Sequence, residues 1–132
     1  MIAFRVYGNP VPKQSFRYVK GGGYTSPRVT AWQSTVTLSA VQAMRGADPL
    51  EGELSVSLVF FLPDKRRRDL DNLSKAVLDA MNRVVYTDDQ QITALRIIKL
   101  FGADPGVDVE VKGIVSDSRG IVATEYLGEG TA

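Results

Sequence analysis

The chain has 132 residues, 44% of them hydrophobic, which is enough for one domain with an apolar core. It contains no cysteine and no histidine, which excludes disulfides, thiolate nucleophiles, imidazole bases and the usual zinc sites. The net charge is only +1, but residues 1–46 carry six cations and no acid, a distribution typical either of a surface that faces a polyanion or of cations that only solubilise the domain.

The remaining chemistry is that of carboxylates, amines and hydroxyls. An ion bound by such groups would be a hard, oxygen-ligated one. No apolar run approaches the roughly 20 residues that span a membrane, and the start of the chain lacks a signal-peptide pattern. We therefore expect a cytoplasmic protein without a membrane partner.

The chain begins with a predicted strand and a long loop. Residues 2–7 alternate as a half-buried strand does, and two prolines follow. Residues 13–28 predict an irregular loop in which aromatic residues interleave with cations. Such residues can stack on bases and contact phosphates, so Lys13, Arg17 and Lys20 are candidate DNA-binding residues. A loop whose aromatic side chains pack back onto the core fits the sequence about equally well.

A helix and a strand come next. We predict a helix from an N-cap at Thr30 to about Ala47. Its buried stripe comprises Trp32, Val36, Ala40, Ala43 and Met44. Residues 53–62 alternate as a strand with an apolar face of Leu54, Val56, Leu58, Phe60 and Leu62. Because Val59 and Phe61 are apolar too, this end of the strand is either central in the sheet or covered by a partner subunit.

Cations run directly into two carboxylates in residues 65–75, which read Lys-Arg-Arg-Arg-Asp-Leu-Asp-Asn-Leu-Ser-Lys. Side chains two residues apart share a side in an extended segment but not in a helix. Asp69 and Asp71 can therefore converge only before the next helix begins. Lys75 follows Asp71 by one turn, near a helix start that favours phosphate. The helix buries a stripe of Leu73, Val77, Ala80, Met81 and Val84.

Each part of this motif also has a structural interpretation. A single aspartate at this position is more often a helix cap than a metal ligand. Three consecutive cations, here Arg66, Arg67 and Arg68, usually form a solvated surface. Asp79 lies on the same polar face two turns further on, and we expect it to form a local salt bridge. The combination with Lys75 favours a magnesium site.

Two acids, Asp88 and Asp89, precede a predicted strand at residues 92–101. Such a pair is usually an Asx turn or a helix cap. Because the preceding helix returns the chain to the sheet, we expect a carboxylate here to meet Asp69 and Asp71 at a shared ion.

The expected architecture is α+β, with a mixed sheet of about four strands and two main helices in a single domain of residues 1–115. Residues 107–115 alternate as the last strand. Residues 116–132 are acidic and contain glycines, and they predict a tail that is partly ordered at most.

The central segment resembles a known family. Leu-Pro-Asp-Lys-Arg-Arg-Arg-Asp-Leu-Asp-Asn-Leu-Ser-Lys-Ala-Val-Leu-Asp-Ala-Met, followed by Thr-Asp-Asp-Gln-Gln-Ile, is similar to the RusA-type crossover-junction endodeoxyribonucleases. The resemblance implies that Asp69, Asp71 and Asp89 bind metal and that Lys75 is the essential lysine. The connection before Asp88 lacks the glycine often found there, so Asp88 stays an alternative ligand.

The function implied by this resemblance is resolution of four-way (Holliday) DNA junctions by a homodimer that makes paired nicks in recombination and repair. One or two Mg²⁺ ions would assist phosphodiester hydrolysis, and Arg66, Arg67 and Arg68 would bind flanking phosphates. Two alternatives stay open at this point. One is a non-catalytic protein that binds DNA structures, and the other is a small phosphohydrolase acting on nucleotides.

Overall fold

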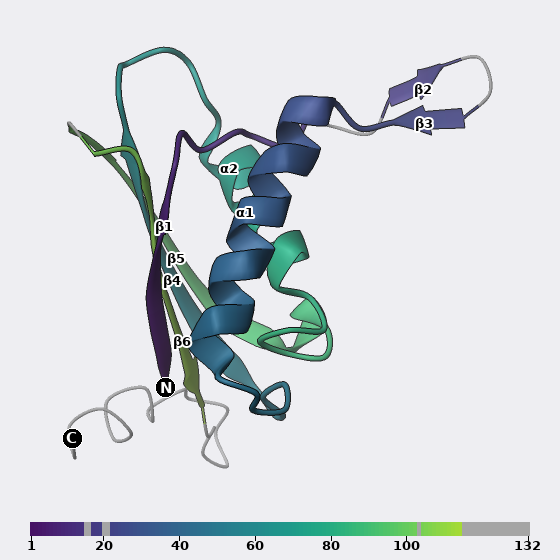
Figure 1. Ribbon diagram of the computed structural model, residues 1–132, viewed down its shortest axis with the longest axis vertical. Coiled ribbons are helices and arrows are strands. Elements are labelled where there is room, and N and C mark those ends of the chain that lie inside the picture. Colours follow the sequence, from purple (N-terminus) through teal and green to yellow (C-terminus); the bar gives the residue numbers. More distant parts are fainter. Residues whose placement is uncertain (15–16, 20–21, 103, 115–132) are drawn as a thin grey trace.

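Two helices cover one face of a four-stranded sheet in the computed structural model, which describes residues 1–14, 17–19, 22–102 and 104–114 (Figure 1). The strands are β1 (Ile2–Tyr7), β4 (Leu54–Leu62), β5 (Ile92–Phe101) and β6 (Gly106–Gly113), and the main helices are α1 (Pro27–Met44) and α2 (Leu70–Met81). The predicted single α+β domain with a mixed sheet is confirmed.

The sheet has the strand order β1-β6-β4-β5. β4 and β5 are parallel, whereas β6 pairs antiparallel with both β1 and β4. A parallel pair needs a crossover connection, and α2 supplies it. The polar segment that precedes α2 therefore leaves the sheet at the end of β4, and the segment that follows α2 enters it at the start of β5.

Alternation along β4 builds the core. Its predicted apolar face, from Leu54 to Leu62, is almost fully buried beneath the helices. Val59 and Phe61 are half-buried on the other face. β4 lies between β6 and β5, so the first explanation for this doubly apolar strand, a central position in the sheet, is the observed one.

α1 begins earlier than predicted. Ser26 is its N-cap, and the Ser26 Oγ accepts a hydrogen bond from the Val29 amide at 3.3 Å. Pro27 occupies the first turn, where its missing N–H costs nothing. Thr30 lies inside the helix, where its hydroxyl donates to the Ser26 carbonyl. The residues of the predicted apolar stripe of this helix are buried, except for Ala43, which is half-buried.

The predicted irregular loop contains a short antiparallel hairpin of β2 (Arg17–Val19) and β3 (Gly22–Tyr24). Figure 1 shows this hairpin projecting from the body of the molecule, beyond the N-terminal end of α1. Two of the three glycines that suggested an irregular loop, Gly22 and Gly23, instead lie in β3. Alternation was too short there to indicate the two strands.

Close packing of β1 against β6 requires a glycine. A Cβ atom at Gly106 would collide with the backbone carbonyl of Val6. The predicted tail of residues 116–132 lies outside the described residues. Neither described main helix is long and apolar enough to cross a membrane.

Candidate functional site

The loop of residues 63–69 is held by its own polar groups. The Asp64 carboxylate accepts hydrogen bonds from the Arg66 amide at 2.9 Å and from Arg68 Nη1 at 3.0 Å. These bonds hold the pKa of Asp64 below its ordinary value. The bond from the Arg66 amide has the larger effect, and the bond from the Arg68 guanidinium has the next largest. These hydrogen bonds therefore fix the conformation of the loop that leads to the start of α2.

Arg68 is the central anchor of this loop. Its side chain is 7% exposed, and Nη1 also donates to the Asp64 and Arg66 carbonyls. From β5, Lys99 Nζ donates to the Arg68 carbonyl at 2.8 Å. Arg68 is thus engaged inside the loop, and its predicted phosphate contact stays a prediction.

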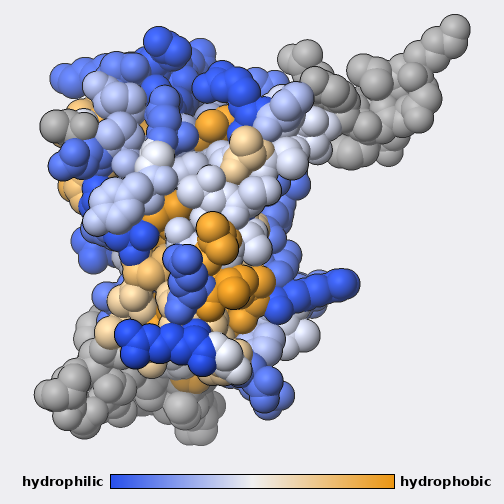
Figure 2. Space-filling view, in the orientation of Figure 1, coloured by the Kyte–Doolittle hydropathy of each residue, from blue (hydrophilic) through white to orange (hydrophobic). Residues whose placement is uncertain are grey.

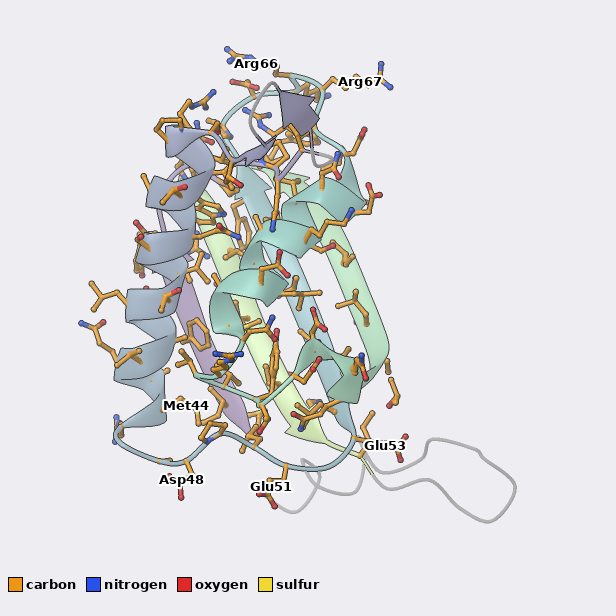
Figure 3. All side chains as sticks on the ribbon, turned by 90° about the vertical axis from the view of Figure 1, so that its right-hand side faces the viewer. Met44, Asp48, Glu51, Glu53, Arg66 and Arg67 are labelled. Atoms are coloured by element: carbon orange, nitrogen blue, oxygen red, sulfur yellow. The ribbon has the colours of Figure 1, made fainter. Side chains whose placement is uncertain are left out.

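Arg66 and Arg67, in contrast, are exposed. Figure 3 shows both side chains pointing into solvent at one end of the molecule. Figure 2 shows that this end is covered mainly by hydrophilic residues. Both guanidinium groups are therefore accessible to a polyanion.

Two predicted catalytic acids lie at the start of α2. Asp69 is the N-cap residue in extended conformation, but its side chain makes no capping hydrogen bond. Its carboxylate receives a long contact of 3.5 Å from Asn72 Nδ2. Asp71 lies in the first helical turn, and Asp71 and Lys75 are both exposed. The Asp69 carboxylate therefore does not cap the helix, in contrast to the structural interpretation of this residue.

Lys13 reaches the same face of α2 from the first loop. Its Nζ lies 2.6 Å from Asp79 Oδ2, and its amide donates to the Asn72 carbonyl at 2.9 Å. The predicted local salt bridge of Asp79 is wrong in its partner, because Lys13 is 66 residues away in the chain. Lys13 therefore clamps the base of the hairpin segment to the helix that carries Asp71 and Lys75.

Asp88 and Asp89 form a capped turn, η1 (Asp89–Gln91). Asp88 Oδ1 accepts from the Gln90 amide, and Gln91 Oε1 accepts from the Asp88 amide. Burial raises the pKa of Asp89, as do the Asp88 hydrogen bond and the charges of Asp88 and Asp79. Asp88 thus uses its carboxylate in a cap, while Asp89 lies within electrostatic reach of Asp79.

The sheet topology separates the predicted acids within one chain. Because β4 and β5 are parallel, the start of β5 lies beside the start of β4, whereas Asp69 follows the end of β4. α2 lies between them, and its 12 residues span roughly 18 Å. No three acidic groups among the described residues are close enough to hold one metal ion. The expected meeting of Asp89 with Asp69 and Asp71 is therefore not formed in the single chain.

The donor chemistry nevertheless suits a hard divalent cation. Carboxylate oxygens are the preferred ligands of Mg²⁺, and both acids at the start of α2 are exposed. Arg66, Arg67 and Lys75 add positive charge nearby for a phosphate group. The carboxylates of Asp69 and Asp71 are therefore suitable ligands for a divalent cation. A third acid would be needed to complete the predicted set of three ligands.

Sequence reasoning missed the residues that shape the site. Lys99 and Asp64 fix the loop before Asp69, and Gln91 fixes η1 by donating to the Leu50 and Gly52 carbonyls at 3.0 Å. A Glu or Gln three residues after an Asp is a capping-box signal, so Gln91 could have been found. Lys99 has no local signal, because its acceptor lies 31 residues away.

Comparison with known proteins identifies the same family that the central segment resembles. The model of the family described as Endodeoxyribonuclease RusA matches residues 7–112. A crossover junction endodeoxyribonuclease RusA from Aquifex aeolicus is 32% identical over 108 residues, which cover 78% of this chain and 84% of that protein. Its namesake from Shigella sonnei is 32% identical over 92 residues, covering 69% and 76%. The crossover junction endodeoxyribonuclease RusA from Escherichia coli K12 is 30% identical over 92 residues, which cover 69% of this chain and 76% of that protein.

Proposed function

The chain belongs to the RusA family of endodeoxyribonucleases, and we propose that it resolves four-way DNA junctions by paired, Mg²⁺-dependent nicks in recombination and repair. One observation carries this proposal. Asp69 and Asp71 lie at the start of α2, directly after the exposed Arg66 and Arg67. A helix N-terminus flanked by cations attracts a backbone phosphate, and adjacent carboxylates can hold the cation that its hydrolysis needs.

Each residue has a proposed task. Asp69, Asp71 and Asp89 would hold Mg²⁺, with Asp88 as an alternative ligand. Lys75 would contact the scissile phosphate or orient the attacking water. A bound Mg²⁺ ion would supply activation of a water nucleophile and neutralisation of charge on the phosphate and leaving oxygen.

The basic residues would position DNA without reading its sequence. Arg66 and Arg67 are exposed for this task, whereas Arg68 acts through the loop that carries them. Lys13 is paired with Asp79, so it would act mainly by holding the segment that contains Arg17 and Lys20.

A homodimer is part of the proposal, because a four-way junction has approximate two-fold symmetry and two equivalent sites could cut two strands. Two-fold dimers are the commonest assemblies. Dimerisation would also offer a way to complete the acid set, since Asp89 of one copy could join Asp69 and Asp71 of the other.

The decisive test is cleavage of a labelled four-way junction with and without Mg²⁺, beside a linear duplex of the same sequences. The parent protein should cut only the junction, and only with the metal. Asp71→Asn should lower cleavage by at least about a hundredfold and keep junction binding, because it removes a ligand rather than a DNA contact. Asp48→Asn, an exposed acid at the opposite end of the molecule (Figure 3), is the matched control and should cut normally.

The alternatives give different results in this experiment. A non-catalytic DNA-binding protein would bind the junction and leave it intact in Mg²⁺. A nucleotide phosphohydrolase would release phosphate from nucleoside triphosphates in parallel incubations and ignore the junction. Either outcome would overturn the proposed function.

A further inference from the structure

The face of the sheet that carries no helix is a surface that the proposed function does not use. Figure 1 shows α1 and α2 on one side of the sheet, and no helix or strand among the described residues covers the other side. We propose that this uncovered face binds single-stranded DNA, with an unpaired base stacked on Tyr7 beside Arg5. The site is separate from the acids at the start of α2. It rests on the proposed function for the choice of DNA as the nucleic acid.

Strand register determines which side chains share the uncovered face. Side chains alternate between the core and this face along each strand, and pairing across the four strands sets one row of Tyr7, Gly106, Phe61 and Leu100. The row lies where β1, β4 and β5 end, and the basic loop at residues 65–68 follows β4 directly. The aromatic row and the basic loop therefore lie at the same end of the molecule.

Gly106 leaves a gap in this row between two aromatic rings. Tyr7 and Phe61 pair with Gly106 from its two sides, so two strand spacings of about 4.8 Å each separate their strands. The guanidinium carbon of Arg5 lies 5.3 Å from the centre of the Tyr7 ring and 4.4 Å from the centre of the Phe61 ring. These three side chains line a hollow of about 460 Å³, a size typical of small-ligand sites.

Arg5 is fixed in this hollow by two hydrogen bonds. Its Nη1 donates to Asp108 at 3.1 Å, and its Nη2 donates to the Asp104 carbonyl at 2.8 Å. Tyr7, in contrast, is 70% exposed. Unpaired bases stack on exposed aromatic rings and on the planes of arginine side chains. Because Arg5 is already ordered, a base that stacks here immobilises few further protein groups.

A cation lies further along the same face. Arg96 pairs with Ser57, four residues before the aromatic row on β4 and β5, at a distance of roughly 13 Å. The acids of β6 on this face have partners, because Asp108 pairs with Arg5 and Glu110 pairs with Lys112 at 3.1 Å. Arg96 is exposed and would contact a backbone phosphate of a strand that crosses the sheet.

The mixture of side chains on this face favours a nucleic acid over a protein partner. Apolar residues of β4 and β5 alternate across the sheet with charged residues of β6. The cores of protein interfaces are depleted in charged residues. Surfaces that bind single strands instead combine aromatic rings with cations. Single-stranded DNA is therefore the occupant that the chemistry of the uncovered face favours.

Binding of labelled oligo(dT) by the full chain tests the stacking site. Fluorescence anisotropy is measured in EDTA, so that no cleavage occurs. Tyr7→Leu keeps an apolar side chain but removes the ring, and it should weaken oligo(dT) binding by at least about fivefold. Tyr7→Phe keeps the ring and should bind like the parent. Equal affinity of all three proteins for oligo(dT) would overturn the proposal.

Junction binding and a second surface provide the controls. Tyr7→Leu should leave the affinity for a fully paired four-way junction within about twofold, because phosphate contacts rather than unpaired bases hold a paired arm. A parallel loss of both affinities would show a general defect and overturn the proposal. Leu38→Ala, at an exposed residue of α1 on the other side of the sheet, should change neither affinity.

The predicted phosphate contact has its own measurement. Arg96→Gln should weaken oligo(dT) binding and reduce the slope of log affinity against log salt by about 0.7, the contribution of one contact to a single strand. An unchanged slope would remove Arg96 from the proposed path.

Photocrosslinking locates the base directly. An oligo(dT) in which 5-iodouracil replaces one base is irradiated on the parent protein, and crosslinked peptides are identified by mass spectrometry. We expect crosslinks at Tyr7. Crosslinks confined to residues 13–28 would place stacking in the first loop and overturn the proposal.

These measurements separate this site from the proposed function. A chain that stacks oligo(dT) on Tyr7 but never cuts a junction would leave the site correct and the nuclease assignment wrong. A chain that cuts junctions and binds oligo(dT) equally well without the Tyr7 ring would show the reverse. Tighter binding of oligo(U) than of oligo(dT) would overturn the choice of DNA. A change in sedimentation of Tyr7→Leu without a change in oligo(dT) affinity would assign the face to a protein contact instead.

Discussion

Lys13 and Asp79 show how a single pair can join distant parts of the chain to the site. Their side chains are 33% and 32% exposed, and they meet at 2.6 Å. Charge type and spacing allowed the acids and cations of residues 65–75 to be proposed as one site, because these residues are neighbours in the sequence. The partners of Asp79 and of the Arg68 carbonyl could not be predicted, because they lie 66 and 31 residues away and leave no periodic signal.

The pair should be coupled energetically. Lys13→Met and Asp79→Asn should each lower the free energy of unfolding by about 1 kcal/mol, and the double variant by less than the sum, because the half-buried pair is broken only once. Urea denaturation of the parent and the three variants gives the cycle. Arg28→Met, at an exposed cation, is the control and should change stability little. Additive losses would show that the contact contributes nothing.

Periodicity predicted the elements better than their ends. The strands at residues 2–7 and 92–101 have the predicted bounds, and the strand of residues 53–62 begins one residue later. A long alternating pattern is a strong signal, because every second residue must enter the core. The predicted start of α1 was wrong. Ser26 and Thr30 both suit a helix cap, but Pro27 directly after Ser26 is itself a sequence signal for a helix start at Ser26.

The two cap candidates make a direct comparison. Ser26→Ala should destabilise the protein by about 1 kcal/mol, because it leaves the Val29 amide without its acceptor. Thr30→Ala should have a much smaller effect, since its exposed hydroxyl only supplements a bond of the helix backbone. Thermal unfolding followed by circular dichroism measures both. A larger loss for Thr30→Ala would place the helix start where the sequence alone suggested.

Two exposed cations and three exposed acids lie at opposite ends of the molecule. Figure 3 shows Arg66 and Arg67 at one end and Asp48, Glu51 and Glu53 at the other. The sequence showed an excess of cations before residue 46 but not this arrangement, because the basic loop at residues 65–68 reaches its end only through the fold. DNA would therefore approach the basic end, and the acidic end would face away.

Salt dependence measures this polarity. Replacing Arg66 and Arg67 by glutamine should weaken junction binding and reduce the slope of log affinity against log salt by about two, since each released phosphate contact contributes roughly one. Fluorescence anisotropy over a series of salt concentrations gives the slope. The Asp48→Asn, Glu51→Gln double variant should keep the parent slope. Equal slopes in both double variants would contradict a basic binding end.

The pairing of β1 with β6 has a consequence for biosynthesis. Ile2 pairs with Val111, and β6 is the only strand among the described residues that hydrogen-bonds to β1. β1 is therefore synthesised well before β6, the neighbour with which it pairs. During that interval the apolar side chains of β1 have no sheet to join. A ribosome that stalls before residue 106 would release a protein that cannot close its sheet.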